Sequence, residues 1–568
     1  MKKTLFAAAL MACCLGASAA HAEGVTVERF THQNVPGSQT CYDQPEDVAE
    51  TEVTAELPDV YFGMRLNNPV IRAYLKADTP VTSEITAEQY SKFGKLLASE
   101  TRSVEIGAEE TAFEFDRVRN SVSVKLYADG EYIGGINDEI EYENGLHFTA
   151  APSDHQIYQR GADDTAVVTI AGTVEAEADP DVIIGEDSIS VKGDEADNGS
   201  VIIAARYDDN GTLIGVEMKE ADGSETEFTS DTPYGNVKVM VWDGLENMES
   251  KKPAVSSSVT VTAENKATGE VTRKLASTIG GFNAELTLGT GLYDITVTGS
   301  GDPVAFRDVG VGDICVAAGQ SNMTDMGAPA DGFDPETDDP IIDGMHIIYP
   351  EDNTWQDMAH PAGEGRFFKT GVRTSPVTSF AREITEETGV PIGIVQSSVG
   401  GTNIYQWAHG VAPGNALDGY LIDAMKSCFD NMPSTDVKGI IWYQGCNDTM
   451  DETYAYSYEE LEGEIFGQLR EFFGEDTPII TTQINDAKQD DNSSLGYYDA
   501  WSYVKDVQRR NPELFENVYV VGTGAYDLGD TIHNSAASNL KVGDSWARAA
   551  LNRVYGMEDV DYLHPTVD

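Results

Sequence analysis

The sequence predicts a multidomain protein in which all-β, sandwich-like modules precede an α/β domain built on a parallel sheet. The chain has 568 residues, which is too long for one compact core. Up to about residue 310, short segments of alternating apolar and polar residues dominate. After that point, apolar runs alternate with amphipathic helical patterns. This second pattern predicts apolar parallel strands covered by helices on both faces.

Residues 1–22 have the features of a secretory signal peptide. Lys2 and Lys3 precede a short apolar run, and Ala20-His21-Ala22 offers a cleavage site with small flanking residues. We expect cleavage after Ala22 and a secreted or periplasmic bacterial protein. The stretch 10–13 resembles a weak lipobox, so a lipid anchor is an alternative. No other run is long enough for a membrane helix.

The β-rich half divides at segments rich in turn and linker residues. We expect a domain of unknown role at 23–195, a small β module at 196–255 and a β lead-in at 256–310. Turn signals such as Asp209-Asn210-Gly211 separate its strands. One segment, 86–99, has a helical pattern instead. The clearest alternating segments are 121–135, 166–178, 201–219 and 236–245.

The remaining residues, 311–568, are expected to form the α/β domain. Helices are predicted at 416–432 and 457–474, where apolar residues recur at helical spacing. Strands are predicted at 314–318, 345–350, 391–398, 439–444, 478–484 and 517–524.

The chain is strongly acidic, with 96 Asp and Glu against 37 Lys and Arg and a formal charge of −59. Such a charge would repel nucleic acids and anionic membrane surfaces, which are therefore excluded as partners. It also disfavours strongly anionic polymers as substrates. The sequence does not indicate an oligomeric state.

Four cysteines follow the signal peptide: Cys41, Cys315, Cys428 and Cys446. Cys315 lies in an apolar strand and is predicted to be a buried thiol, whereas Cys428 and Cys446 are candidates for a disulfide. No Cys or His spacing indicates a zinc site. We therefore expect neither a metal nor a cofactor.

The stretch "ICVAAGQSNM" raises the possibility of a catalytic serine. An apolar strand turns at Gly319 and exposes Ser321, at the strand end where such sheets carry their active sites. A nucleophilic serine needs a base, an acid that orients the base, and donors for the oxyanion. The spacing of Asp530 and His533 lets the carboxylate reach Nδ1 while Nε2 faces the serine. A second D-x-x-H, Asp561 to His564, is a rival near the C-terminus.

Four blocks in order carry a family resemblance: "GQSNM", "SSVGGTNIYQW", "GIIWYQGCND" and "DLGDTIHNSAASNLKVG". The region from about 255 to 560 resembles the sialate O-acetylesterase-like (SASA) branch of the SGNH hydrolases. The resemblance implies a three-layer α/β/α, flavodoxin-like fold and carbohydrate O-acetylesterase activity. It implies that Ser321 is the nucleophile, His533 the base and Asp530 the acid.

The resemblance also implies the oxyanion donors. They would be the Ser321 backbone N–H, a glycine for which Gly401 is chosen over Gly400, and an amide from either Gln444 or Asn447. The chain departs from the family pattern at two places. Cys446 replaces an expected glutamate, and Asn534 replaces the proline that usually follows the histidine.

Gln320, Asn322 and Trp407 are expected to contact the substrate, although Trp407 could equally pack in the core. We expect an esterase that removes acetyl groups from acetylated xylan or a related plant polysaccharide. One alternative is a sialate O-acetylesterase, in which the substrate is anionic. An alternative from another class is a non-catalytic glycan-binding surface protein, supported by the loss of glutamate at 446.

Overall fold

The computed structural model describes most of the chain in two compact units. The described residues up to 137 form the first unit, and those from 145 onward form the second. The first unit ends within the span 23–195, for which the sequence predicts a single domain. The described residues are 25–33, 50–53, 70–90, 96–118, 121–137, 145–174, 181–192, 199–246, 248–299, 301–324, 334–350, 353–363, 374–411, 419–430, 432–487 and 498–562. The predicted signal peptide and Cys41 lie outside them.

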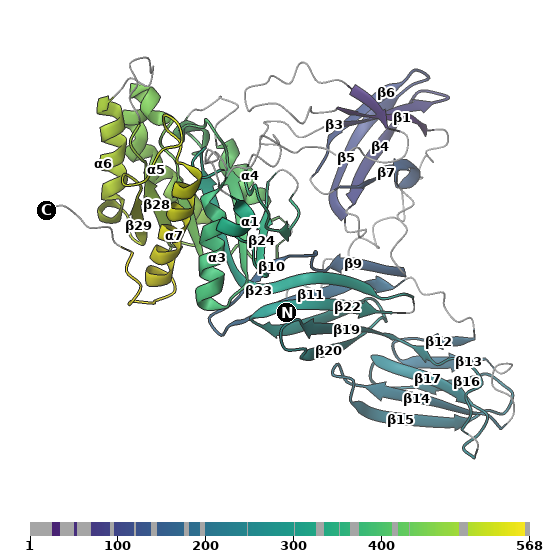
Figure 1. Ribbon diagram of the computed structural model, residues 1–568. Coiled ribbons are helices and arrows are strands. Elements are labelled where there is room, and N and C mark those ends of the chain that lie inside the picture. Colours follow the sequence, from purple (N-terminus) through teal and green to yellow (C-terminus); the bar gives the residue numbers. More distant parts are fainter. Residues whose placement is uncertain are drawn as a thin grey trace. The chain divides into compact units, whose positions relative to one another are not determined.

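The first unit consists of two antiparallel sheets that share one core (Figure 1). Alternating burial along the strands sends apolar side chains such as Ile71, Ile85 and Leu126 inward. One sheet contains β2 (Glu50–Val53), β1 (Val25–Gln33), β3 (Val70–Ala77) and β6 (Thr111–Asp116); the other contains β5 (Leu96–Ile106), β4 (Val81–Tyr90), β7 (Ser123–Ala128) and β8 (Glu131–Ile136).

The helix predicted at 86–99 is wrong. Its described residues belong to strands β4 and β5, which pair antiparallel, as in Thr86 with Thr101. The segment contains many helix formers, but Ala87 and Gln89 are buried on one face of β4 with period two. Pairing with β5 and β7 outweighs local helix propensity at this position.

The second unit begins with strands that build a small module and a β lead-in. The module has its own core around Ile202, Phe228 and Val239. Its sheets are β12 (Val182–Ile184), β13 (Ser188–Val191) and β16 (Thr226–Thr229), and β15 (Leu213–Glu220), β14 (Val201–Tyr207), β17 (Asn236–Trp242) and β18 (Val255–Ser256). The predicted lead-in at 256–310 contains β19 (Ser258–Asn265), β20 (Val271–Ser277), β21 (Phe282–Gly289) and β22 (Gly291–Thr298). Three strands from the predicted 23–195 domain join its sheets: β9 (Leu146–Ala150), β10 (Ile157–Gln159) and β11 (Thr165–Val174). Below, the lead-in means all seven strands.

One long strand, β23 (Val304–Gly319), joins the lead-in to the α/β domain. Its first half pairs antiparallel with β22, and its second half pairs in parallel with two strands of the α/β domain. The predicted boundary between residues 310 and 311 therefore falls inside a single strand. The whole sheet is mixed rather than purely parallel.

The α/β part of the sheet has the strand order β24-β26-β23-β27-β28-β29, with all neighbours parallel. A short strand, β25, pairs antiparallel at the edge. All six strands predicted in this half are present, so that part of the prediction is confirmed. They are β24 (Met345–Ile348), β26 (Ile392–Ser398), β27 (Gly439–Tyr443), β28 (Ile479–Gln483), β29 (Val518–Gly522) and the end of β23, and β25 spans Gln356–Asp357.

Two pairs of helices pack on this sheet (Figure 1). In one pair, α3 (Pro376–Thr388) contacts α7 (Ala536–Arg553); in the other, α5 (Glu452–Phe473) contacts α6 (Tyr498–Leu514). Gly543 lets α7 approach α3 closely, because a Cβ at this position would lie 2.1 Å from the Pro376 carbonyl oxygen. Both predicted helices are found, one of them shorter than expected. None of the described helices is long and apolar enough to cross a bilayer. The helices are α1 (Pro335–Asp338), α3 (Pro376–Thr388), α4 (Tyr420–Ser427), α5 (Glu452–Phe473), α6 (Tyr498–Leu514) and α7 (Ala536–Arg553).

The disulfide considered between Cys428 and Cys446 is not formed. Both thiols are buried separately, and Cys446 Sγ instead lies 3.6 Å from Asn322 Nδ2. Cys315 is a buried thiol in β23, as predicted, and burial raises its pKa.

Candidate active site

The strand order creates a topological switch point at the carboxyl ends of β23 and β26. The chain leaves β23 toward β24 on one side, and leaves β26 toward β27 on the other. Ligands bind at such a switch point in open α/β sheets. Ser321 follows β23 and Gly401 follows β26, so two predicted site residues follow the ends of neighbouring strands.

Gly319 makes the sharp turn that presents Ser321. Its φ is +154°, and a Cβ at this position would lie 2.1 Å from the carbonyl oxygen of Tyr443. The next residue, Gln320, donates its backbone N–H to that same carbonyl at 3.0 Å. The Thr324 hydroxyl then binds the Ser321 carbonyl at 2.9 Å. The central strand therefore ends in a fixed turn with Ser321 at its start.

Gln320 holds a neighbouring loop in place. Its side chain is buried, and its Oε1 accepts the N–H groups of Gly445 at 3.0 Å and Asn447 at 3.2 Å. Its Nε2 lies 3.5 Å from the Ser321 hydroxyl. Gln320 therefore has a positioning role, and its contact with a substrate stays a prediction.

Asp530 and His533 form the predicted pair. Asp530 Oδ2 lies 2.7 Å from His533 Nδ1, and its Oδ1 accepts the backbone N–H groups of Ile532 at 2.9 Å and His533 at 2.7 Å. Burial acts to raise the pKa of Asp530, but these hydrogen bonds outweigh it and the pKa lies below its usual value. Asp530 is therefore ionised at neutral pH and fixes Nδ1 as the protonated nitrogen.

Asn322 links the serine turn to the histidine loop. Its Nδ2 donates to the Ile532 carbonyl at 3.1 Å, and its Oδ1 accepts the Asn534 N–H at 3.0 Å. It thus holds the residues on both sides of His533. Among the described residues, no hydrogen bond directly joins the Ser321 hydroxyl to His533. Asn322 is fully buried, which leaves it no surface for the predicted substrate contact.

Asn534, at the position where the family usually has proline, is a second anchor. It is fully buried, its Nδ2 lies 3.2 Å from the Tyr443 hydroxyl, and its Oδ1 accepts from Asn485 at 3.0 Å. A proline could supply none of these bonds, nor the N–H that Asn322 accepts. The departure at 534 therefore leaves the loop well anchored. The sequence analysis identifies Asn534 as a departure from the family pattern but does not predict that it anchors the histidine loop.

The two candidate amides for the oxyanion site lie in different environments. Gln444 is fully buried, and its Nε2 already contacts Gln320 Oε1 and the Thr402 carbonyl, both at 3.3 Å, and the Asp448 carboxylate. Asn447 is half-buried, and its Nδ2 donates to the Gly401 carbonyl at 3.0 Å. Asn447 therefore has an N–H left for a ligand, whereas Gln444 does not.

Asp448 fixes the loop that carries Gly401. Its Oδ1 accepts the Ile404 N–H at 2.7 Å, and the carboxylate also binds Gln444. Burial raises the pKa of Asp448 to about 7, although these hydrogen bonds act in the opposite direction. A φ of +74° at Gly401 gives this loop its left-handed turn.

Trp407 does not form the predicted sugar platform. Its side chain is fully buried, and its ring packs edge-on against Trp442 with centroids 5.0 Å apart. The alternative considered for it, core packing, is what the structure contains.

Only the start of the rival histidine motif is described, and His564 is outside the described residues. The Asp561 carbonyl accepts from Arg548. Arg548 lies 12 residues along α7 from Ala536, or about 18 Å, whereas His533 lies three residues before that helix. Asp561 is therefore at the far end of α7 from His533.

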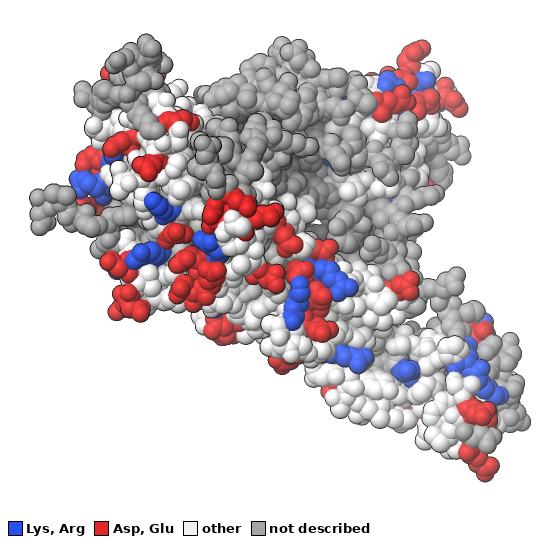
Figure 2. All heavy atoms as spheres, in the orientation of Figure 1, with Lys and Arg blue, Asp and Glu red and all other residues white. Residues whose placement is uncertain are grey.

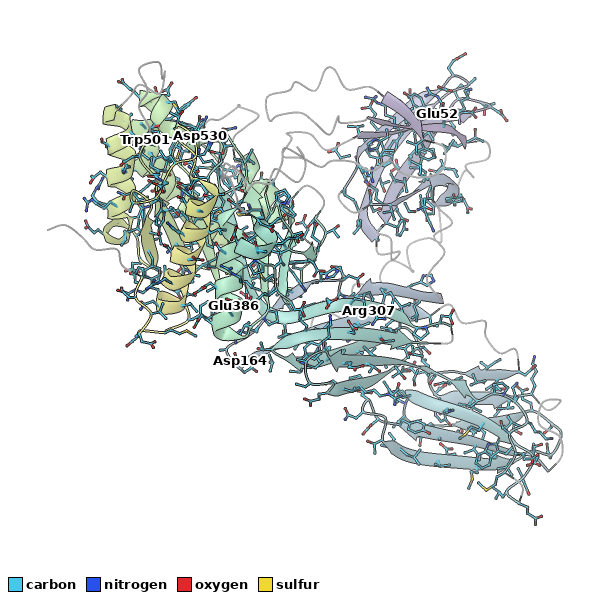
Figure 3. The ribbon with its side chains drawn as sticks, in the orientation of Figure 1. Glu52, Asp164, Arg307, Glu386, Trp501 and Asp530 are labelled. Atoms are coloured by element: carbon cyan, nitrogen blue, oxygen red, sulfur yellow. The ribbon has the colours of Figure 1, made fainter. Side chains whose placement is uncertain are left out.

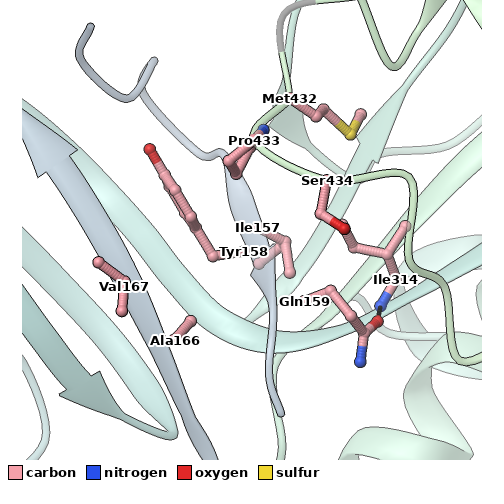
Figure 4. Close-up of a pocket in the computed structure, with 9 residues that line it drawn as sticks. All are labelled: Ile157, Tyr158, Gln159, Ala166, Val167, Ile314, Met432, Pro433 and Ser434. Atoms are coloured by element: carbon pink, nitrogen blue, oxygen red, sulfur yellow. Dashed lines mark hydrogen bonds between the residues drawn. The ribbon is translucent and has the colours of Figure 1, made fainter. Parts of the chain in front are cut away.

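Figure 3 shows Asp530 at the end of the α/β domain opposite Glu386, near the last turn of α3. A separate pocket lies toward the other end (Figure 4). Its lining includes Tyr158, Ile314 and Met432, and Gln159 Oε1 accepts the Ile314 N–H there at 2.7 Å. None of the residues predicted for catalysis lines this pocket.

Residues 311–552 match the family model of SASA, described as carbohydrate esterase, sialic acid-specific acetylesterase. The match covers less than half of the chain and contains Ser321, Gly401, Asn447, Asp530 and His533. No curated protein matches the chain.

Several solved structures are similar at low identity. A carbohydrate acetylesterase from Xanthomonas citri is 20% identical, with coverage of 74% of this chain and 78% of that one and a TM-score of 0.42. An Arabidopsis thaliana protein is 23% identical, with 42% and 98% coverage and a TM-score of 0.36. A family two carbohydrate esterase from Clostridium thermocellum is 12% identical, with 72% and 99% coverage and a TM-score of 0.26.

Proposed function

We propose that residues 311–552, which match the SASA carbohydrate esterase model, form a carboxylic ester hydrolase that uses Ser321 to remove acetyl groups from a neutral glycan. The observation that carries the proposal is the bridge made by Asn322. It binds the backbone on both sides of His533 while standing next to Ser321 in sequence. A base and a nucleophile are thereby held on adjoining loops.

The proposed reaction follows the logic of a serine hydrolase. His533 Nε2 takes the Ser321 proton as Oγ attacks the acetyl carbonyl carbon. The tetrahedral intermediate collapses, the sugar oxygen leaves with the proton from His533, and an acetyl-serine ester remains. Water, activated by the same imidazole, then attacks this ester and releases acetate and free Ser321. Asp530 stabilises the imidazolium in both halves of the reaction.

The oxyanion is proposed to bind three donors: the backbone N–H groups of Ser321 and Gly401 and the Nδ2 of Asn447. Asn447 is chosen over Gln444 because the Gln444 amide is already engaged and fully buried. The bonds from Asn447 to Gly401 and to Gln320 hold these groups together before substrate binds. Such fixed donors contribute strongly to acyl-transfer catalysis.

The proposed substrate is acetylated xylan or a related plant polysaccharide, and the proposed location is outside the cytoplasm. Acidic side chains spread over the face of the second unit drawn in Figure 2, in keeping with the formal charge of −59. This charge disfavours the carboxylate of an O-acetylated sialic acid more than an uncharged glycan. The signal-like segment at residues 1–22 supports secretion.

Acetate release from acetylated xylan and from O-acetylated sialic acid tests the proposal directly. The wild type should release acetate from xylan, and Ser321→Ala should lower the rate by at least about 10³-fold. Release only from the sialic acid would favour the sialate esterase alternative. A folded wild type inactive on both substrates, yet bound to a glycan, would overturn catalysis in favour of the binding-protein alternative.

A further inference from the structure

Two histidines and an aspartate gather at the sheet edge, away from the proposed active site. His346 in β24 and Asp357 in β25 are directly opposite each other in the antiparallel pair. His155 lies in the turn before β10 and joins them. Neither the sequence pattern nor the esterase chemistry accounts for this cluster.

The three side chains converge at metal-ligand spacing. Asp357 Oδ1 lies 3.1 Å from His155 Nδ1 and 3.5 Å from His346 Nε2, and one ligand atom from each residue lies within 4.8 Å of the others. Ligand atoms around one tetrahedral zinc ion are about 3.3 Å apart, given bonds of about 2.0 Å. The atoms are therefore close to positions from which they could share one cation.

The hydrogen bonding of His346 prepares its Nε2 to be a ligand. Its Nδ1 lies 2.6 Å from the His155 carbonyl oxygen, which can only accept, so Nδ1 carries the proton. Nε2 therefore has the lone pair, and metal-binding histidines are commonly oriented in this way.

His155 is also placed as a ligand. Its Nδ1 is buried and makes no hydrogen bond among the described residues, even though Asp357 Oδ1 is 3.1 Å away. A buried ring nitrogen without a hydrogen bond is costly unless another partner binds it. The backbone at His155 is left-handed, with a φ of +60°, which holds the ring against β24.

We propose that His155, His346 and Asp357 bind one divalent cation of the zinc class. Two imidazole nitrogens and one carboxylate oxygen suit such a cation better than calcium or magnesium, which prefer oxygen ligands. The exposed side of Asp357, 70% accessible, leaves room for water as the fourth ligand. The cation would fasten the lead-in turn to the edge of the α/β sheet.

The site has a structural rather than a catalytic role. His346 is level with Gly393 of β26, which is level with Ile314 of β23. Ile314 is five residues before Gly319, or about 16 Å along the strand. The cation would therefore be far from the Ser321 turn, and its removal should leave acetate release by folded enzyme unchanged.

Titration of the tag-free full chain with Co²⁺ tests the site without using esterase activity. The buffer contains millimolar Mg²⁺, which occupies exposed carboxylates so that they do not bind Co²⁺. We expect one Co²⁺ per chain with the visible absorption of a tetrahedral site, competed by Zn²⁺. Asp357→Asn and His155→Asn should weaken Co²⁺ binding at least about 100-fold, since even the loss of outer partners costs 10- to 100-fold. Asparagine tolerates the left-handed backbone at 155.

The matched control is Asp423→Asn. Asp423 pairs with His409 at 2.8 Å on the surface but belongs to no three-residue cluster among the described residues. The Asp423→Asn variant should bind Co²⁺ as the wild type does. Zn²⁺ should also raise the Tm of the wild type by roughly 3 °C or more, but not that of Asp357→Asn. Absence of a Co²⁺ band in the wild type, or equal binding by Asp357→Asn, overturns the proposal.

Discussion

The two ends of the parallel sheet are held by different chemistry. At the carboxyl ends of the strands, neutral amides from Gln320, Asn322, Gln444 and Asn534 join the loops. At the opposite end, Arg160 donates two hydrogen bonds of 3.0 Å to the carboxylate of the buried Asp313. His155 and His346 lie beside Asp357 at this end. Most bonds that join the loops at the first end come from neutral amides, whereas the buried Arg160–Asp313 ion pair fixes the other end.

This difference fits what each end is proposed to do. A developing oxyanion and an imidazolium respond strongly to any charge fixed nearby in a water-poor site. Amide bonds can position loops there without adding such a charge. Asp530 and Asp448 are the exceptions. The charge of Asp530 faces the imidazole that it serves, and burial raises the pKa of Asp448 to about 7. No reaction is proposed at the other end, so ion pairs can stabilise it.

The largest effect is expected from removing the charge of Asp530. Asp530→Asn should lower kcat for acetate release by about 10³- to 10⁴-fold, because the amide no longer fixes the histidine tautomer or stabilises the imidazolium. Initial rates at pH 7.5 (about one unit above an ordinary histidine pKa) measure it. Asp527→Asn, in the same loop, is the control. A fall of less than tenfold would argue against the Asp530–His533 assignment.

The next effect separates the two amides at the oxyanion site. Asn447→Ala should lower kcat by about 10²- to 10³-fold with little change in Tm, because it removes a transition-state donor from a half-buried position. Gln444→Ala should instead destabilise the fold by about 2 kcal/mol, since Gln320 and Asp448 lose a buried partner. Measurements of kcat and of thermal unfolding for both variants show which amide is the oxyanion donor. The reverse pattern would make Gln444 the donor.

The charged end can be broken without touching the reaction. Arg160→Met leaves the Asp313 carboxylate buried, with side-chain exposure of 1%, and should cost about 3 kcal/mol of unfolding free energy. The kcat of folded enzyme should stay the same. Arg509→Met breaks an exposed pair with Asp506 and should cost under about 1 kcal/mol. Denaturant melts compare them, and equal losses would contradict the contrast between buried and surface pairs.

The smallest effect concerns Glu462, a buried carboxyl in α5. Burial raises the pKa of Glu462 to about 7, against hydrogen bonds from Asn511 and Trp442. Since the folded pKa lies above the unfolded one, the stabilisation is full at low pH and lost as the pH rises. Unfolding free energy should fall by about 2 kcal/mol between about pH 5 and pH 7 through this group.

Glu462→Gln tests this pH dependence. Asn511 Oδ1 has no hydrogen-bond partner among the described residues, so a turned Asn511 amide can accept from the new side chain. Denaturant melts across this pH range should show a drop smaller by about 2 kcal/mol than in the wild type. An unchanged slope would mean that Glu462 does not titrate there.

The sequence allows prediction of the strands but not of the long-range amide contacts. Apolar runs identify all six parallel strands of the α/β part, because burial on both faces removes polar residues from them. They do not identify the short antiparallel edge strand β25. The bonds from Asn322 to residues 532 and 534 span more than two hundred positions. A residue's type states what it can donate or accept, but not which loop reaches it. This is why Gln320 and Asn322 are predicted as substrate contacts.

Local patterns also misled where tertiary pairing decides. Trp407 could pack or stack, and only the position of Trp442 shows that it packs. Residues 86–90 contain helix formers, yet they belong to a strand. The His155 cluster combines residues far apart in sequence, so no spacing rule could find it.

Strand β23 determines where this protein can be shortened. A fragment that starts at residue 311 would lose seven residues of a sixteen-residue strand, 304–310, together with the partner strand β22. The remaining part of β23 would then expose unpaired backbone N–H and C=O groups to other chains. Such a fragment should aggregate. For expression, the esterase domain should therefore begin before β9, so that β9, β10 and β11 are retained with the rest of the lead-in.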